Sequence, residues 1–198
     1  MWIIPSRSRP HNCARLFAAG FSTSGVLCVD DDDPMLDGYR RLALPDRWVL
    51  AIGKRDGLSE IYNRAFRTHP WELWYGVGAD DMLPETPAWD QRLIHAALPD
   101  GLAFGDDGIN GDKHATHFVI GGRLVREMGW LALPGLQRIF IDTMWNTLTE
   151  KRGVRRYLPD VKLTHLHFSN GTAPVDATYR KVGKARDRAI YQQWKDGL

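Results

Sequence analysis

Two adjacent carboxylates, Asp80 and Asp81, follow the apolar run at residues 71–77. Adjacent carboxylates at the end of a strand repel each other unless a cation lies between or beside them. Oxygen ligands suit Mg²⁺ or Mn²⁺, which also bind the phosphates of substrates. The dipeptide is therefore a candidate metal site. The alternative is an ordinary turn, where aspartate is common.

Two histidines, His165 and His167, flank Leu166 in a run that has the character of a strand. Side chains alternate between the faces of a strand, so both imidazoles are expected on one face. Such a pair can bind a divalent metal or contact phosphate. His114 and His117 have helical spacing but lie in a glycine-rich stretch, so they are weaker candidates.

Asp142 lies within the strongly apolar residues 139–145. A buried acid is costly unless it has a partner. Burial would raise its pKa and make the carboxylate a general base. The alternative is the polar face of a helix, which would contain Asp142 and Asn146.

The first half of the chain alternates short apolar runs with helical patterns. Strands are expected at residues 2–5, 25–30, 47–52 and 71–77. Helices are expected at residues 10–19, 59–69 and 87–98, the last with Thr86 as its N-cap and Pro87 as its first residue. This alternation predicts an α/β fold, a mostly parallel sheet flanked by helices in a single domain. Ligands of such sheets bind beyond the carboxyl ends of the strands. Two of those ends are basic, at Pro5-Ser6-Arg7 and Gly53-Lys54-Arg55. The other two are acidic, at residues 30–33 and 78–81.

The second half is mixed. Strands are expected at residues 103–105, 117–120, 155–157 and 163–168. Helices are expected at residues 122–128, 136–151 and 179–194. We divide the chain into a domain at residues 1–175 and a basic C-terminal helix or tail at residues 176–198.

The charges separate along the chain, although the net charge is only +2. Residues 1–20 carry three arginines and no acid, and residues 178–198 carry six basic and two acidic residues, so the middle is acidic. The small net charge argues against a surface that is wholly a nucleic-acid footprint.

Cys13 and Cys28 form no metal-binding pair and are expected to be free thiols. No apolar run approaches about 18 residues, so we expect no membrane span and a cytoplasmic protein.

Taken in order, these segments resemble the GT-A glycosyltransferases, a Rossmann-like fold, and most closely their family-2-like group. The first half carries four matches. Pro5-Ser6-Arg7-Ser8-Arg9 resembles the loop that receives the nucleotide, and Val29-Asp30-Asp31 resembles the segment whose acid binds the base. Residues 57–65 resemble the glycine-led helix, with Asn63 near its middle, and residues 77–84 resemble the Asp-x-Asp segment. The second half carries three: residues 126–130 before the acceptor loop, residues 141–145 with the catalytic acid, and the closing Gly153, Tyr157, Pro159, His165 and His167. The resemblance covers about residues 2–168, and the first acid of Asp-x-Asp falls on Gly78.

The resemblance implies a metal-dependent, inverting glycosyltransferase that moves a sugar from a nucleoside-diphosphate sugar, with a UDP-sugar favoured, to an acceptor hydroxyl. Asp142 would be the catalytic base. Mn²⁺ or Mg²⁺ would bind to residues chosen from Asp80, Asp81, His165 and His167. The nucleotide sugar would contact Pro5, Ser6, Arg7, Arg9, Asp30, Asp31, Lys54, Asn63 and Asp80.

Two other functions remain open. One is a metal-dependent phosphoesterase or nucleotidyltransferase, and the other is an inactive module that binds nucleotide sugars. The acceptor is open as well. The basic tail could contact DNA, so that hydroxylated bases would be the acceptor, or it could be an amphipathic helix packed on the domain, with a soluble glycan as the acceptor.

Overall fold

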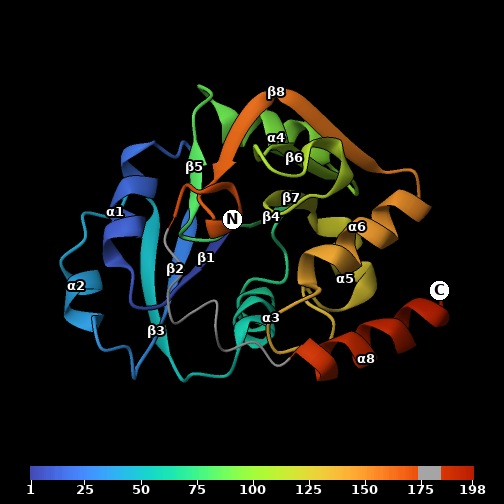
Figure 1. Cartoon of the computed structure of the whole chain (residues 1–198), viewed down its shortest axis with the longest axis horizontal. Coiled ribbons are helices and arrows are strands. Elements are labelled where there is room, and N and C mark those ends of the chain that lie inside the picture. The colour runs from blue at the N-terminus through green and yellow to red at the C-terminus, as the bar shows by residue number, and fades with distance from the viewer. Residues whose placement is uncertain (174–183) are drawn as a thin grey trace.

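The computed structural model describes residues 1–173 and 184–198 (Figure 1). Its strands form an eight-stranded sheet in the order β3-β2-β1-β4-β7-β6-β8-β5. The strands are β1 (Trp2–Ser6), β2 (Gly25–Asp30), β3 (Trp48–Gly53), β4 (Trp74–Val77), β5 (Met82–Pro84), β6 (Leu102–Asp106), β7 (Phe118–Gly121) and β8 (Arg155–His165). The helices are α1 (Pro10–Ala18), α2 (Leu36–Arg40), α3 (Leu58–Thr68), α4 (Trp89–Ala97), α5 (Gly122–Met128), α6 (Ile141–Lys151) and α8 (Lys184–Asp196), with short 3-10 turns at Gly111–Lys113 and Phe168–Asn170.

The first half forms the parallel part of the sheet. β1 pairs in parallel with β2 and β4, and β2 pairs in parallel with β3. Helical segments connect these strands, as parallel strands require. The α/β class and the strands expected at residues 2–5, 25–30 and 47–52 are confirmed. The carboxyl ends of β1, β2 and β4 therefore meet at one edge of the sheet.

The second half makes the sheet mixed. β7 runs antiparallel to both β4 and β6, and β8 runs parallel to β6 and antiparallel to β5. The two short strands expected at residues 155–157 and 163–168 are one strand, β8. Its pairing with β6 jumps from Leu158 to Lys162, so the predicted break is a bulge within a continuous strand.

Alternating side chains place apolar residues on both faces of the sheet. Trp2 and Ile4 of β1 pack in the same cluster as Leu16 of α1 and Leu93 of α4. Ile3 packs on the opposite face in a second cluster, which includes residues of α3, α5 and α6. Both faces are therefore covered by helices, as a parallel sheet needs. Within the described residues, no helix combines the length and apolar character that crossing a bilayer demands.

Two helix starts were predicted wrongly. The helix expected from residue 136 begins at Ile141, because Phe140 has a left-handed backbone with φ of 69°. Helix α4 begins at Trp89, and Thr86 does not cap it. The Thr86 hydroxyl instead accepts a hydrogen bond from the backbone N–H of Lys162 at 2.8 Å, because β8 lies beside it.

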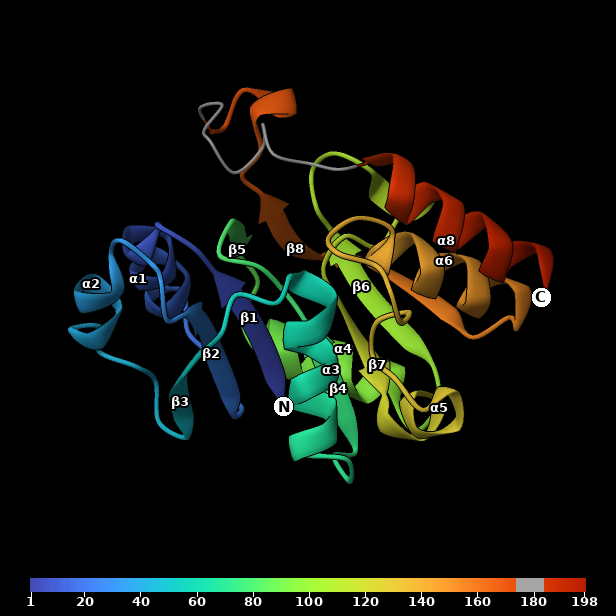
Figure 2. The same cartoon turned by 90° about the horizontal axis from the view of Figure 1, so that it is seen from below.

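The C-terminal helix α8 packs alongside α6 (Figures 1 and 2). The Tyr191 ring stacks on that of Phe140, with centroids 5.0 Å apart and planes at 6°. The Tyr191 hydroxyl also hydrogen-bonds to that of Thr147 at 2.8 Å. The described part of the predicted tail is thus an amphipathic helix on the domain. Its expected start at residue 179 and the proposed division after residue 175 lie outside the described residues.

Candidate active site

A cavity of about 850 Å³ opens at the carboxyl ends of β1, β2 and β4. Seven of the residues proposed from the sequence line it: Pro5, Ser6, Arg7, Arg9, Asp30, Asp80 and Asp81. Other walls come from the start of α3 and from Gln137 and Arg138. The topology therefore brings together the loop after β1, the acid after β2 and the acids after β4, as the rule for strand ends predicts.

Arginine and aspartate are paired along the rim of this cavity. Arg7 donates hydrogen bonds to Asp30 at 2.8 Å and to Asp32 at 2.6 Å. Arg55 lies 3.7 Å from Asp32. The buried Asp33 accepts hydrogen bonds from the backbone N–H groups of Ser8 and Met35 and shapes the turn. Of the run at residues 30–33, Asp30 is thus the acid that faces the cavity.

Asp80 is held by the loop after β1. The Ser6 hydroxyl donates to one carboxylate oxygen at 2.5 Å, and the Arg9 guanidinium donates to the other at 3.2 Å. Burial, together with the charge of Asp81, raises the pKa of Asp80 to about 6. Both oxygens therefore have partners, and the role of Asp80 in the structure is to join β4 to the loop after β1.

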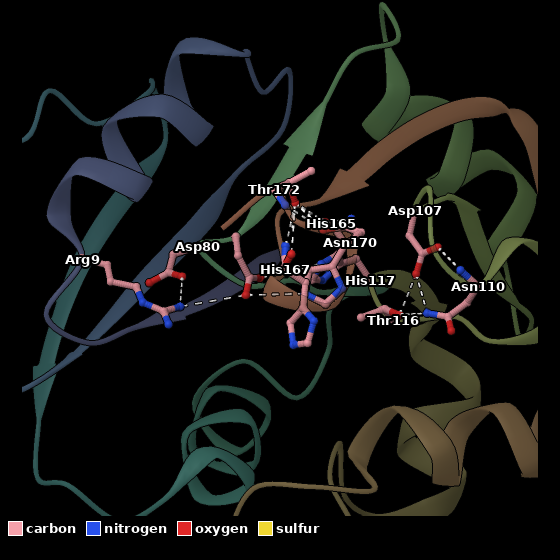
Figure 3. Close-up of polar contacts among 11 residues, drawn as sticks. Arg9, Asp80, Asp107, Asn110, Thr116, His117, His165, His167, Asn170 and Thr172 are labelled. Atoms are coloured by element: carbon pink, nitrogen blue, oxygen red, sulfur yellow. Dashed lines mark hydrogen bonds and ion pairs between the residues drawn. The ribbon is translucent and has the colours of Figure 1, made fainter. Parts of the chain in front are cut away.

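Asp81, His117 and His165 form the candidate metal centre. Figure 3 labels the two histidines. One potential ligand atom from each lies within 4.8 Å of the others. His165 Nε2 is 3.5 Å and His117 Nε2 is 3.9 Å from carboxylate oxygens of Asp81. His117 Nε2 is buried and has no hydrogen-bond partner among the described residues. Two imidazoles and a carboxylate, with a buried nitrogen lacking a partner, fit a divalent metal.

The protonation states in this group also suit a metal. Burial and the neighbouring His165 lower the pKa of His117 to about 4, so its imidazole is neutral near pH 7. Burial works to raise the pKa of Asp81, but the hydrogen bond to His165 and the nearby cations lower it to about 2. Neutral histidine and ionised carboxylate are the forms that bind metals.

The group of three differs from the set proposed from the sequence. Asp81 and His165 belong to it, whereas Asp80 and His167 lie outside it and His117 takes part. The His167 ring instead lies against that of Phe168, at 4.2 Å between centroids. At the position of the missing first acid, a Cβ on Gly78 would lie 2.6 Å from Ile4 Cδ1, so the buried Ile4 side chain would have to shift.

A loop built around Asp107 positions both histidines (Figure 3). The Asp107 carboxylate accepts hydrogen bonds from the backbone and side-chain amides of Asn110, at 2.6 and 2.7 Å, and from the Thr116 hydroxyl at 2.9 Å. Its carbonyl accepts from the backbone N–H of His165 at 2.9 Å. One loop thus leads into His117 and also anchors His165. His117 was only a weaker candidate from the sequence, because it lies in a glycine-rich stretch, although its spacing from His114 is evident there.

Asp142 lies in the first turn of α6 and pairs with His114, at 3.0 Å from Nε2 to the carboxylate. Its other oxygen accepts from the backbone N–H and the hydroxyl of Thr143, at 2.7 and 3.2 Å. Burial works to raise the pKa of Asp142, but these hydrogen bonds and the His114 charge outweigh it and lower the pKa. The expectation of a raised pKa was therefore wrong, because the carboxylate has partners on both oxygens.

Three proposed nucleotide contacts lie elsewhere. Asp31 and Lys54 are exposed and are not among the residues that line the cavity. Asn63 is buried, and its amide bonds to the backbone of Leu131 and Ala132 at 2.8–2.9 Å. The Asn63 side chain thus ties α3 to that segment.

The cavity wall at Gln137 and Arg138 is held from behind by α8. The carboxylate of Asp187, which is 1% exposed, accepts hydrogen bonds from three successive backbone N–H groups, those of residues 137–139, at 2.9–3.0 Å. The Gln137 carbonyl in turn accepts from the backbone N–H of Leu58 at 2.8 Å. The terminal helix therefore contributes to the architecture of the cavity.

Comparison with known proteins identifies the fold. No family model matches the chain, and no curated protein sequence matches it. Solved structures are similar at low identity. The mannosyltransferase PcManGT from Pyrobaculum calidifontis, in complex with GDP-Man and Mn²⁺, is 16% identical with a TM-score of 0.61, over 83% of this chain and 55% of that chain. S. aureus TarS 1–349 is 12% identical with a TM-score of 0.57, over 82% and 59%.

A nucleotidyl transferase from Methanothermobacter, Mth528, is 13% identical with a TM-score of 0.50, over 99% of this chain and 95% of that chain. The chain thus spans little more than half of the two proteins named first and nearly all of the third. These likenesses confirm the expected GT-A nucleotide-sugar transferase-like fold.

Proposed function

We propose that the protein is a metal-dependent, inverting glycosyltransferase that uses a nucleoside-diphosphate sugar, with a UDP-sugar favoured. The observation that carries this proposal is the cavity at the strand ends, where arginines lie beside the group of Asp81, His117 and His165. A diphosphate needs cationic partners, and a sugar nucleotide needs a pocket of this size next to them. The printed ligands of the mannosyltransferase, GDP-Man and Mn²⁺, are of the same kind.

Each group in the cavity has a proposed role. Asp30, with Asp31 beside it, accepts hydrogen bonds from the base or ribose, and Pro5 and Ser6 form the floor of the nucleotide site. Arg7 exchanges its aspartate partners for phosphate oxygens, and Arg9 contacts phosphate while it stays bonded to Asp80. Lys54 supplies further charge from the rim. Asn63 supports the site by holding residues 131–132.

Asp81, His117 and His165 would hold Mn²⁺ or Mg²⁺. When bound, this ion would supply positive charge to the leaving diphosphate. Asp80, which the sequence also favoured, keeps the loop after β1 next to these ligands through Ser6 and Arg9. His167 remains a candidate for contact with phosphate.

The acid–base chemistry falls to Asp142 and its partner His114. An attacking hydroxyl must lose its proton as it bonds to the anomeric carbon, and a positioned base contributes about 10²–10⁴-fold to such a step. Direct attack from the face opposite the diphosphate inverts the configuration at that carbon.

The buried thiols of Cys13 and Cys28 fit a cytoplasmic location.

Incubation of the protein with Mn²⁺ and a panel of UDP-, GDP- and TDP-sugars tests the proposal, with donor hydrolysis followed by mass spectrometry. Cleavage of one donor to its nucleoside diphosphate is the expected result. Asp142→Asn should abolish cleavage and leave the affinity for the nucleoside diphosphate unchanged. Cleavage at the wild-type rate by Asp142→Asn would remove this residue from the mechanism.

A nucleotidyltransferase is the second candidate, because this chain spans 95% of Mth528 but only 55% of the mannosyltransferase. The same incubation with nucleoside triphosphates and sugar 1-phosphates would then release pyrophosphate. Cleavage of simple phosphoesters would indicate a phosphoesterase. Binding of a nucleotide sugar without any turnover would indicate an inactive binding module.

DNA and soluble glycans are the two proposed acceptor classes. Arg186, Arg188 and Lys195 of α8 are exposed and could contact a phosphate backbone. Deleting α8 would also remove Asp187, so the test is the triple substitution of these three residues with alanine. A salt-dependent affinity for DNA that this variant loses supports a DNA acceptor, and an unchanged affinity excludes this face.

A further inference from the structure

The hydrogen bond between His114 and Asp142 fixes the position of a proton. A carboxylate can only accept hydrogen bonds, so the proton on His114 Nε2 must point at Asp142 across the 3.0 Å contact. A neutral imidazole carries one N–H, which leaves Nδ1 with a lone pair. Among the described residues, Nδ1 has no hydrogen-bond partner.

Asp142 is by contrast poorly placed to take a proton itself. One oxygen accepts from His114 and the other from the N–H and the hydroxyl of Thr143. Protonation would give up at least one of these hydrogen bonds. A histidine oriented through one nitrogen by a carboxylate, with the other nitrogen open, is a common arrangement for a general base.

The pair lies close in sequence to the metal group and to the cavity wall. His114 precedes His117 by three residues, and Asp142 follows Arg138 by four. The charge of Asp142 reaches both His117 and Tyr62, a residue of the cavity. The His114 side chain is 27% exposed, so solvent reaches part of it.

We propose that His114 takes the proton of the attacking hydroxyl on Nδ1, and that Asp142 holds and orients this imidazole. The inference rests on the proposed glycosyl transfer and divides its acid–base step between two residues. The hydroxyl oxygen bonds to the anomeric carbon as its proton moves to Nδ1. The bond from that carbon to the diphosphate oxygen breaks, and its electron pair leaves with the diphosphate. The imidazolium then returns its proton to water.

The charges that face His114 agree with this role. The hydrogen bond to Asp142 raises the pKa of His114 above its ordinary value of 6.5, against the opposing effect of burial. Arg155 of β8 works to lower this pKa, and Asp107, directly after β6, works to raise it. Proton transfer works best when the pKa of the base lies near the working pH.

The kinetic test uses hydrolysis of the donor that the panel identifies, with Mn²⁺ and with water as the acceptor. His114→Ala should slow hydrolysis about 100-fold or more, and added imidazole should restore part of the rate. His114→Gln should be equally slow, and His95→Gln, at an exposed position on α4, is the matched control. The wild-type rate should decrease as the pH drops below an apparent pKa, and this pKa should lie above 6.5. The assignment would be overturned by a loss of rate smaller than about 10-fold in His114→Ala, or by a failure of imidazole to restore it. It would also be overturned if the wild-type rate did not change with pH down to about 5.

Nitrogen-15 NMR of the full chain decides the tautomer without any activity. We expect Nε2 protonated and Nδ1 unprotonated at about pH 8, and a smaller preference in Asp142→Asn. The opposite tautomer in the wild type would overturn the proposal. If the wild type cleaves no donor at all, the proposed function fails, and the NMR result still judges the arrangement of the pair.

Discussion

Two regions carry acids with basic partners: the rim at the ends of β1 and β2, and the centre, by which we mean the metal group together with the His114–Asp142 pair. The basic partners differ between the two regions. On the rim the partner is arginine, as in the contacts of Arg7 with Asp30 and of Arg9 with Asp80. In the centre the closer partner is histidine, as in the contacts of His114 with Asp142 at 3.0 Å and of His165 with Asp81 at 3.5 Å, although Arg9 also lies 3.9 Å from Asp81.

The two partners have different chemistry. A guanidinium stays charged at all relevant pH values and suits the recognition of phosphate. An imidazole changes charge near neutral pH, accepts a proton or ligates a metal. We therefore propose that the rim binds the donor and that the centre carries out the reaction. Substitutions in the two regions should differ in the property that they change.

The largest expected effect is on metal affinity in the centre. Asp81→Ala and His117→Ala should each weaken Mn²⁺ binding about 100-fold or more, because each removes one of three ligands. His167→Ala should bind Mn²⁺ as the wild type does. Titration followed by electron paramagnetic resonance measures the free ion, with Asp37→Ala on the exposed surface of α2 as the control. Equal affinities of all four variants would refute the site.

The next effect is on stability, at the segment before α6. Asp187→Ala leaves three backbone N–H groups without their acceptor, and each such loss costs about 1 kcal/mol or more. We expect the free energy of unfolding to fall by about 3 kcal/mol in urea denaturation. Asp196→Ala, in an exposed position on the same helix, should change it little. If both substitutions cost the same, Asp187 does not hold the cavity wall.

On the rim, burial should rank the arginines. Arg9 is 12% exposed and its partner Asp80 is 6% exposed, so Arg9→Ala leaves a buried acid without this cation. We expect a loss of about 2–3 kcal/mol in the free energy of unfolding at neutral pH. Arg7 is more exposed, so Arg7→Ala should cost much less, and high salt should shrink its cost further. A greater loss in Arg7→Ala would contradict the ranking.

The smallest expected effect is the pH dependence of the His114–Asp142 pair. The hydrogen bond to Asp142 raises the pKa of His114 above 6.5, so the stabilisation by His114 is complete below about 6.5 and is lost as the pH rises through the folded value. The pKa of Asp142 is lowered from 3.8, so its stabilisation is present above about 4 and is lost as the pH falls through the folded value.

The pair therefore stabilises the fold most between about pH 4 and 6.5. His114→Gln should lower the free energy of unfolding by at most about 1 kcal/mol more at pH 5.5 than at pH 8.5, because both side chains are partly exposed. Thermal unfolding at the two values measures this difference. A cost that is larger at the higher pH would reverse the sign and refute the pairing.

Local patterns were enough for much of the fold. Short apolar runs at 2–5 and 25–30 predicted β1 and β2, and Pro10 with Gly20 predicted the start and the end of α1. The rule for strand ends then brought Arg7, Asp30 and Asp80 to one edge. These predictions succeeded because they depend on neighbours in sequence and on a rule that follows from parallel connectivity.

The amino-acid sequence by itself determined which chemical groups are available: the arginines near the N-terminus, the acids after the strands, and the histidines of the second half. Only the tertiary structure decided which acid meets which partner. Asp142 meets His114 across 28 positions and Asp80 meets Ser6 across 74, and α8 reaches back 49 positions to hold Arg138. The direction in which the Asp142 pKa shifts depends on such distant contacts. So does the presence of His117, and not the expected His167, in the metal group. No local pattern encodes them, because the free energy of a buried charge is determined by whichever groups the folded chain places around it.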